Sequence, residues 1–571
     1  MTIGIDLGTT NSAVASSEGA VPIPQMTAPG TVEERLLLPS FLYLPNAGEF
    51  PDGSLEDPYI VGEFARSHGI KVPTRLVASA KSWLSHSGVD RLEKLLPWDA
   101  PSDVQRVSPV EASARYLRHL VRAWTQRHGA IENQDVVLTV PASFDAAARD
   151  LTMQAAKQAG LLNVTLLEEP QAALYSWLEL TGDNFRKQAR VGDVILVVDV
   201  GGGTTDFSLI AVAEEAGDLQ LTRLAVGDHI LLGGDNMDLT LAHNLARDKT
   251  LDNWQFTALT YGCRQAKESL FADSKLKKAP ISVVSRGSAL VGGTLKFDLT
   301  RQDLTQILVD GFMPRVPITE VPKTARRTGL TQLALPYAQD PGITRHLAAF
   351  LTRQSRIAEG KSFVHPTAIL FNGGVFKAAA LKTRITEVVN EWLRADGGSP
   401  VKELEGADLD LAVARGAAYY GFVRQGHGIR IRGGTARAYY VGVEAAVPAV
   451  PGFDPPIRAL CVAPFGMEEG TQADVPPQEF ALVVGEPTVF RFFASSVRRE
   501  DRVGDLVENA QRSDELEEVA PIETTLSGEA GQLVPVNLQA AVTEVGTLEL
   551  RCLEKGGSGR WKLEMNVRTK E

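Results

Sequence analysis

The sequence predicts an α/β fold over most of its length, followed by a small all-β domain. Short apolar runs with strand character alternate with helical stretches up to about residue 423, which is typical of a domain built on a largely parallel sheet. Beyond that point the pattern is strand-like only. The chain has 571 residues, of which 44% are hydrophobic and 22% charged. This composition is globular, and the length exceeds the roughly 100–200 residues of one domain.

The strands of the first part are predicted by four runs rich in β-branched and apolar residues: Thr2–Leu7, Asp135–Val140, Asp193–Val200 and Ala368–Phe371. Continuous apolar runs of this kind are typical of strands that are buried on both faces. Between the strands, the stretch 110–126 carries apolar residues at helical spacing and predicts a helix.

The second part begins after a change of composition. Residues 424–436 (RQGHGIRIRGGTA) have four glycines, three arginines and no acid, which predicts a linker. Residues 437–571 then contain strand-like runs separated by Gly, Pro and Asp, a pattern that predicts a β-sandwich. The clearest runs are Tyr439–Val443, Glu479–Val484, Thr488–Phe493 and Thr547–Cys552.

Charge and cysteine content narrow the class of protein. The net charge is −12, and residues 437–571 contribute −9 of it, from 13 basic and 22 acidic residues. An acidic chain is a poor binder of nucleic acid or anionic membranes. The acidic residues of 437–571 have two interpretations, a solvated surface or a charge-specific site for a partner. Three scattered cysteines without a C-x-x-C pair predict buried, reduced thiols rather than a zinc knuckle. With no signal-like N-terminus and no membrane-length apolar run, we expect a cytoplasmic protein.

Two similar loops each follow a predicted strand. The first is Asp6–Asn11 (DLGTTN), in which Gly8 allows close backbone approach and Thr9 and Thr10 offer hydroxyls. The second is Val198–Asp206 (VDVGGGTTD), whose three glycines cost conformational entropy that phosphate binding would offset. Each loop alone is a weak signal. Together they can face each other across a cleft, where Asp6 and Asp199 could share a hydrated Mg²⁺.

Eight motifs in order carry a resemblance to a known family: IDLGTTNSAVA (Ile5–Ala15), LVASAKSWL (Leu76–Leu84), VVLTVPASFDAAAR (Val136–Arg149), EEPQAAL (Glu168–Leu174), VVDVGGGTTDFS (Val197–Ser208), LLGGDNMD (Leu231–Asp238), LFNGG (Leu370–Gly374) and DLAVARGAA (Asp410–Ala418). The chain resembles the heat-shock-protein-70 (DnaK-like) chaperones of the actin/hexokinase ATPase superfamily. The resemblance implies a two-lobed ATPase domain at 1–423, a linker at 424–436 and a β-sandwich substrate-binding-like domain at 437–571.

The resemblance also assigns roles to residues. It implies that the catalytic residues are Lys81, Glu169, Thr204 and Asp199, and that Asp6 and Asp199 hold Mg²⁺. It implies that ATP is contacted by Gly8, Thr9, Thr10, Asn11, Gly201, Gly202, Gly203, Thr204, Gly234, Lys267, Gly373, Gly374, Lys377 and Asp410. Pro141 and Arg149 match the residues that relay the nucleotide state to the linker.

The chain departs from the family pattern at several positions. Arg264 replaces an acid beside the ribose, and its spacing allows an ion pair with Glu268. Lys377 replaces an arginine beside the adenine. Thr165 replaces an arginine that docks J-domain cochaperones, so we expect no ordinary J-domain coupling. Residues 312–351 are longer than the family's connection and predict an insertion, either a surface elaboration or a partner-docking element. We expect no helical lid after the sandwich.

The resulting hypothesis is an ATP-dependent chaperone that hydrolyses MgATP slowly and binds unfolded or extended polypeptide, with a nucleotide-exchange factor as a candidate partner. One alternative is a nucleotide-gated scaffold for a dedicated partner protein, which the basic linker, Thr165 and the insertion favour. The other is a small-molecule kinase of the same superfamily, although the sequence contains no evident sugar-binding acids.

Overall fold

A computed structural model describes residues 2–566 apart from 52–54, 87, 99, 133, 216–217, 285–293, 324–334, 355–359, 407, 426–430, 433–434, 436, 445–454, 468–470, 477–479, 496, 499, 514 and 544–546. The chain divides into two compact units. Unit 1 comprises 1–144, 151–221 and 225–430, and unit 2 comprises 145–150, 222–224 and 431–571. Most of the predicted linker and the middle of the predicted insertion lie outside the described residues.

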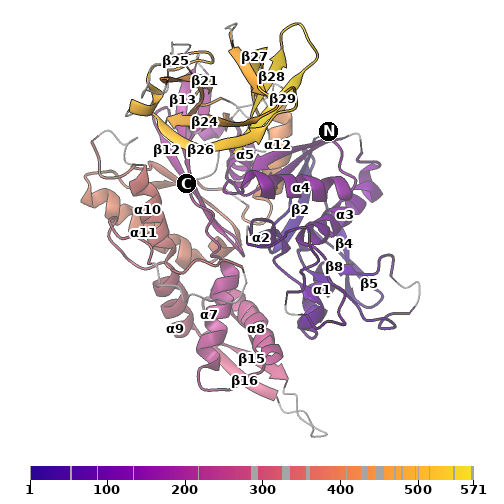
Figure 1. The fold of residues 1–571 in the computed structure, drawn as a ribbon. Helices are drawn as coiled ribbons and strands as arrows, with labels where there is room; N and C mark the ends of the chain where they lie inside the picture. The colour runs from indigo at the N-terminus through magenta and orange to yellow at the C-terminus, as the bar shows by residue number, and fades with distance from the viewer. Residues whose placement is uncertain are drawn as a thin grey trace. The chain divides into compact units, whose positions relative to one another are not determined.

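Unit 1 contains two sheets of mixed direction (Figure 1). The first has the order β11-β10-β1-β2-β3, with β6 paired to β2. Its strands are β1 (Thr2–Asp6), β2 (Asn11–Ser16), β3 (Gly19–Ala20), β6 (Leu38–Pro39), β10 (Asp135–Val140) and β11 (Val164–Glu168). In the second sheet, β18-β17-β12-β13-β14 are successive neighbours. They are β12 (Val194–Val200), β13 (Thr205–Glu215), β14 (Asp218–Val226), β17 (Ala368–Asn372) and β18 (Lys402–Glu403).

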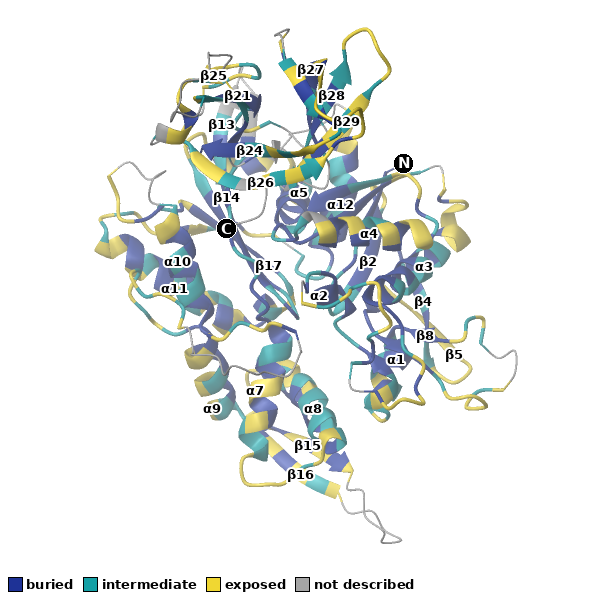
Figure 2. Cartoon of the chain, in the orientation of Figure 1, coloured by how far each residue is buried: buried dark blue, intermediate teal, exposed yellow. Residues whose placement is uncertain are grey.

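The two sheets share one pattern. In each, a central strand pairs antiparallel with the strand that follows it and parallel with a later strand: β1 with β2 and β10, and β12 with β13 and β17. The central strands β1 and β12 are mostly apolar and largely buried (Figure 2), with Asp6 as the last residue of β1 and Asp199 as the last but one of β12. All four predicted strands of this part are confirmed as β1, β10, β12 and β17. Continuous apolar runs are stable as strands whose two faces are both buried.

Helices and hairpins complete residues 1–430. The helices are α1 (Glu63–Gly69), α2 (Ala80–Leu84), α3 (Pro109–His128), α4 (Ala146–Gln158), α5 (Glu169–Thr181), α6 (Phe185–Gln188), α7 (Gly234–Ala246), α8 (Asn253–Ala272), α9 (Arg301–Leu304), α10 (Ile343–Arg353), α11 (Ala379–Ala395) and α12 (Ala412–Arg424). Further strands are β4 (Ile23–Ala28), β5 (Thr31–Arg35), β7 (Leu42–Tyr43), β8 (Ile60–Val61), β9 (Leu76–Val77), β15 (Lys278–Val284) and β16 (Thr294–Thr300). The helix predicted at 110–126 is confirmed as α3, which Ser108 caps by accepting from Glu111 N.

Unit 2 is built mainly from two antiparallel sheets. One has the order β25-β21-β20-β24-β26, and the other β22-β27-β28-β29 with β23 paired to β27. Their strands are β20 (Ala438–Glu444), β21 (Ile457–Ala463), β22 (Thr471–Asp474), β23 (Phe480–Val484), β24 (Pro487–Ser495), β25 (Leu506–Val507), β26 (Glu517–Thr525), β27 (Gln532–Val542), β28 (Thr547–Glu554) and β29 (Arg560–Asn566). One apolar core contains side chains from both sheets, among them Val441, Phe492, Val536 and Leu550.

Two further sequence predictions can be compared with the described residues. Cys263, Cys461 and Cys552 are free and buried, as their spacing predicted. Within the described part of the chain, no helix has the length and hydropathy of a membrane-spanning segment.

Glycines set how closely helices pack in unit 1. A Cβ on Gly416 of α12 would overlap the carbonyl of Ala172 in α5, and a Cβ on Gly4 of β1 would overlap the backbone of α12 at Ala414. The helix α12 therefore contacts both α5 and β1 backbone to backbone.

We predict that Gly416→Ala destabilises unit 1 by about 1–3 kcal/mol, because overpacking forces two backbones apart. The midpoint of urea denaturation measures this loss. Gly311→Ala is the matched control, since a Cβ there meets only Gln306 O, at 3.8 Å. Equal midpoints for the two variants would contradict the packing argument.

Candidate functional site

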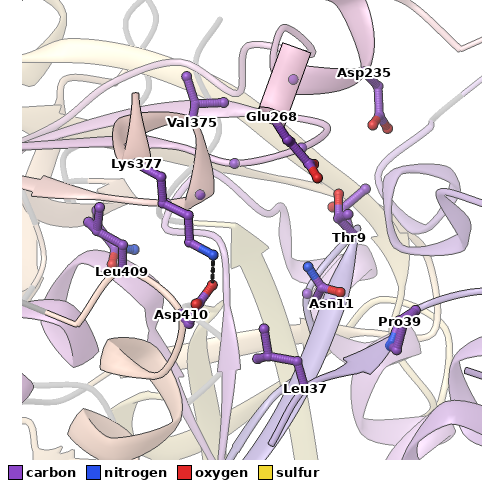
Figure 3. A pocket seen from close by; sticks show the side chains of 18 of the residues that line it. Thr9, Asn11, Leu37, Pro39, Asp235, Glu268, Val375, Lys377, Leu409 and Asp410 are labelled. Carbon is purple, nitrogen blue, oxygen red and sulfur yellow. Dashed lines mark ion pairs between the residues drawn. The ribbon is translucent and has the colours of Figure 1, made fainter. Parts of the chain in front are cut away.

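A cavity of about 950 Å³ lies in unit 1 and is lined by both predicted loops. Figure 3 shows Thr9 and Asn11 on one wall and Lys377 and Asp410 on another. From the first loop the cavity is lined by Gly8, Thr9, Thr10 and Asn11, and from the second by Gly201, Gly202 and Thr204. The two loops therefore face the same cavity, as the sequence predicted.

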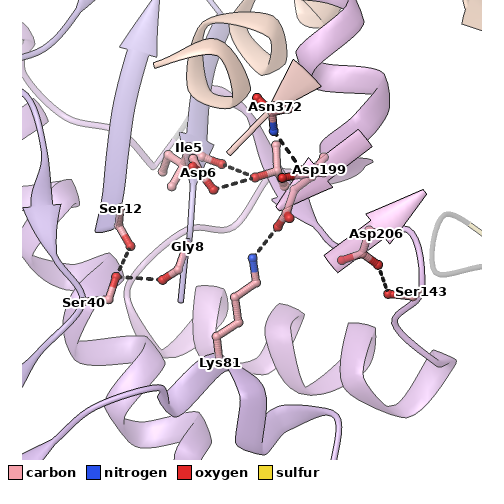
Figure 4. Close-up of polar contacts among 12 residues, drawn as sticks. Ile5, Asp6, Gly8, Ser12, Ser40, Lys81, Ser143, Asp199, Asp206 and Asn372 are labelled. Carbon is pink, nitrogen blue, oxygen red and sulfur yellow. Dashed lines mark hydrogen bonds and ion pairs between the residues drawn. The ribbon is translucent and has the colours of Figure 1, made fainter. Parts of the chain in front are cut away.

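The first loop is a tight turn held from outside. A Cβ on Gly8 would overlap the carbonyl of Asn11, so only glycine fits. Ser40 Oγ donates to Gly8 O at 2.7 Å, and Ser12 Oγ lies 2.9 Å from Ser40 Oγ (Figure 4). These contacts fix the backbone of the turn independently of any ligand.

The second loop packs directly on the first. A Cβ on Gly202 would overlap Thr10 Oγ1, and one on Gly203 would lie 2.7 Å from Thr9 Cγ2. The carbonyls of Gly201 and Gly202 accept from the amides of Gly234 and Asp235 at 3.0 and 2.7 Å. Consecutive glycines are needed because threonines approach from one side and the start of α7 from the other.

Two carboxylates end the central strands at the cavity. Thr139 Oγ1 donates to Asp6 Oδ1 at 3.3 Å, and Asn372 Nδ2 donates to Asp199 Oδ2 at 2.8 Å (Figure 4). Burial, followed by the charge of Glu169, raises the pKa of Asp6 to about 7. The same two causes raise the pKa of Asp199 to about 8. A cation placed beside these carboxylates would favour their charged forms.

A buried ion pair stands beside the carboxylates. Lys81, at the start of α2, pairs with Glu169, the first residue of α5, and their side chains are 6% and 14% exposed. Burial lowers the pKa of Lys81. The charges of Glu169, Asp6 and Asp199 raise it by more than burial lowers it, so the net shift of the pKa is upward. Lys81 is thus held as a cation inside the cavity.

The donor set fits a hydrated Mg²⁺ with a polyphosphate. Thr10 Oγ1 and Asn372 Oδ1 are buried without a hydrogen-bond partner in the structure. The described residues contain no group of three or more His, Cys, Asp or Glu arranged for metal binding. Two carboxylates suffice for Mg²⁺, because this ion keeps several waters and takes its other oxygens from phosphates.

Helix α8 lines the cavity with one face, at Arg264, Lys267, Glu268 and Phe271. The pairing of Arg264 with Glu268 is wrong: Arg264 Nε lies 2.8 Å from Asp238 Oδ2, and its Nη2 pairs with Asp235. Lys267 Nζ also reaches Asp238, at 2.6 Å. The neighbouring α7 presents two carboxylates in a buried setting, which outcompete an exposed Glu268 on the same helix.

The opposite wall begins at a second tight turn. Gly373 has φ +89°, and a Cβ there would overlap Val200 O, so the turn lies against the end of β12. Gly374 follows it, and Lys377 Nζ lies 2.5 Å from Asp410 Oδ1 (Figure 3). Because these side chains are 54% and 37% exposed, the pair is solvated and weak.

The cavity does not gather every predicted residue. Gly203 packs against Thr9, and Pro141 and Arg149 are buried but are not lining residues. Conversely, the cavity includes Asn372 and Asp235, whose motifs were recognised without their roles. It also includes Arg35 and Arg66, which pair with Glu63. No sequence pattern marked them, because β5 and α1 are brought there by tertiary packing alone.

Comparison with known proteins shows a similarity to one family of chaperones. The Hsp70 protein family model matches residues 53–324. Similar curated proteins include the chaperone protein HscA homolog of Histophilus somni (strain 129Pt), 30% identical over 352 residues that cover 56% of this chain and 52% of the relative. The HscA homolog of Bordetella pertussis (strain Tohama I) is 32% identical over 310 residues, 52% of this chain and 45% of the relative. The chain is therefore similar to the Hsp70 family over residues 53–324 and to Hsp70-type chaperones over about half of its length.

The chain also matches the chaperone protein dnaK of Emiliania huxleyi, at 30% identity over 331 residues, 54% of this chain and 48% of the relative. It thus spans about half the length of the curated relatives it matches. The matched family implies a domain of the actin/hexokinase ATPase type, which agrees with the mixed α/β structure of unit 1.

We predict that Arg264→Ala lowers the free energy of unfolding by about 3 kcal/mol, because it removes the cation from the buried Asp238, which is 1% exposed. Urea denaturation of the variant measures the change. Glu268→Ala, one turn along the same face, should stay within about 0.5 kcal/mol. A neutral Arg264→Ala would show that Lys267 alone satisfies the acids of α7.

Proposed function

We propose that this chain is an ATP-dependent chaperone of the Hsp70 type that hydrolyses MgATP slowly and couples hydrolysis to binding of unfolded or extended polypeptide. The observation that carries the proposal is the meeting, in one cavity, of two glycine loops, two strand-end carboxylates and a buried Lys81–Glu169 pair. We propose 1–423 as the ATPase domain, with an insertion at 312–351, 424–436 as the linker, and 437–571 as the substrate-binding-like domain.

The residues at the inner end of the cavity would perform the hydrolysis. Lys81 would stabilise negative charge on the transferred phosphoryl group, since its ammonium is preorganised by Glu169. Glu169 and Thr204 would hold the attacking water in line. The loop amides at residues 8–11 and 201–204 would bind the phosphate oxygens. Mg²⁺, held through Asp6 and Asp199, would supply charge neutralisation between the phosphates.

The outer end would hold the nucleoside. Gly234 and Lys267 line one side of the cavity, and Gly373, Gly374, Lys377 and Asp410 the other. The glycines would let the adenosine lie against the backbone. The guanidinium of Arg264 is paired with Asp235 and Asp238 of α7 and is not free to bind the ribose. We propose that the ribose is bound less tightly here than in family members that have an acid at this position.

The β-sheets of unit 2 would bind the client. Strands bind extended peptide through main-chain hydrogen bonds and one apolar pocket. We propose that Pro141 and Arg149 relay the nucleotide state, that a nucleotide-exchange factor is a partner, and that J-domain coupling is absent, since Thr165 accepts from Arg424 within unit 1. Buried free cysteines are compatible with action in the reducing cytoplasm.

We predict that Asp199→Ala and Lys81→Ala each lower the steady-state rate of Mg-dependent ATP hydrolysis about 100-fold or more, because each removes preorganised charge at the phosphates. Phosphate release measures the rate, with chelation of Mg²⁺ giving a similar loss. Lys278→Ala, on the exposed β15 hairpin, is the control for removing a lysine. Wild-type rates in the two site variants would refute this assignment.

We predict that the chain binds many short apolar peptides flanked by basic residues, because residues 437–571 carry a net charge of −9. A peptide array probed with the ATP-bound and ADP-bound protein measures both the binding and its dependence on nucleotide. Silence across the array, with nucleotide binding intact, would contradict the chaperone and favour a scaffold for one dedicated partner.

A further inference from the structure

His229 lies in the segment between β14 and α7, and the backbone holds it beside Asp206 of β13. Hydrogen bonds on either side of Asp206 join the two segments: Gly227 N donates to Phe207 O at 2.8 Å and Thr205 N to Ile230 O at 2.9 Å. Thr205 Oγ1 also donates to Leu232 O at 2.7 Å. The position of His229 is therefore set by the main chain rather than by its own side chain.

Both nitrogens of the His229 ring meet a serine hydroxyl. Nδ1 lies 2.6 Å from Ser143 Oγ, and Nε2 lies 3.1 Å from Ser85 Oγ. The ring is 16% exposed and packs edge-on against Phe144, with ring centroids 5.6 Å apart. Asp206 Oδ1 lies 3.9 Å from Nδ1. Both ring nitrogens therefore have polar partners although the ring is nearly buried, and these contacts hold the imidazole in one orientation.

The other partner of Ser143 determines the direction of its hydrogen bond with His229. Ser143 Oγ donates to the Asp206 carboxylate, which can only accept while ionised, and Ser85 Oγ lies 2.9 Å from Ser82 O. A hydroxyl has one proton, so Ser143 accepts from His229 Nδ1, whereas the proton of Ser85 can go either to Ser82 O or to Nε2. The ring therefore carries hydrogen on Nδ1, which donates to Ser143 and is connected through that serine to Asp206.

The chain of contacts joins two parts of the proposed phosphate site. Ser85 directly follows α2, the helix that contains Lys81. Asp206 lies opposite Asp199 in the β12–β13 register, and its charge contributes to the raised pKa of Asp199. A single imidazole thus connects the helix of the proposed phosphate-binding lysine to the strand that faces the proposed metal-binding aspartate.

We propose that His229 is a positioning residue that donates to Ser143, contacts Ser85, and thereby fixes α2 and Asp206 relative to each other. This inference rests on the proposed ATP hydrolysis. Partners one contact away from a reactive group typically change activity about 10–100-fold when removed. Neither His229 nor its partners Ser85 and Ser143 line the cavity, so His229 should act on turnover and not on nucleotide binding.

The kinetic test uses His229→Phe, which keeps an aromatic ring without donors, and His229→Asn, whose amide retains a donor near the place of Nδ1. We expect His229→Phe to lower kcat about tenfold with KM for ATP changed less than about twofold, and His229→Asn to recover part of kcat. Ser143→Ala combined with His229→Phe should cost no more than the larger single effect, because both act through Asp206.

Nitrogen-15 NMR of the nucleotide-free wild-type protein tests the contacts without any turnover. Assigned by its absence in His229→Phe, the His229 signal should show hydrogen on Nδ1, and a ring with hydrogen on Nε2 alone would overturn the inferred donor pattern. Wild-type kcat in His229→Phe would refute the inference alone. No hydrolysis by the wild-type chain would refute the proposed function and the role of His229 in it together.

Discussion

Contact between the two glycine loops is the constraint on which the rest of unit 1 depends. Gly202 against Thr10 and Gly203 against Thr9 leave no space for side chains. Because the loops touch, the ends of β1 and β12 are forced together, and Asp6 and Asp199 are desolvated in one cavity. Their raised pKa values follow from that geometry, since burial is the first cause of both shifts.

The charges around the cavity divide into two kinds. Cations are matched with carboxylates, as in Lys81 with Glu169 and Arg264 with Asp238, which makes their burial tolerable. The hydrogen bonds that reach Asp6 and Asp199 come instead from neutral donors of Thr139 and Asn372. Neutral donors orient a carboxylate without neutralising it. Such an arrangement suits groups that must remain available to an incoming cation.

Sequence reasoning succeeded where the signal was local. The boundaries of β1, β10, β12 and β17 were predicted to within one residue, because a buried apolar run encodes its own burial. The second loop could be located because three consecutive glycines cost conformational entropy that a bound phosphate or close packing must offset. Reasoning failed for Arg264, since helical spacing identifies partners only on the same helix and cannot place α7 beside α8. His229 carried no local signal at all, because both its partners come from distant segments.

Close contacts at glycines, which hold the two loops together, also connect the site to the core of unit 1. Gly416 brings α12 against α5, which begins at Glu169, and Gly4 brings α12 against β1, which ends at Asp6. Asp410 lies two residues before the start of α12, so one helix connects three carboxylates from both ends of the cavity. A backbone contact has no rotamers to relax, and a shift of α12 must therefore move these groups together. The precision of the site follows from close packing between glycines and neighbouring backbones, well away from the cavity itself.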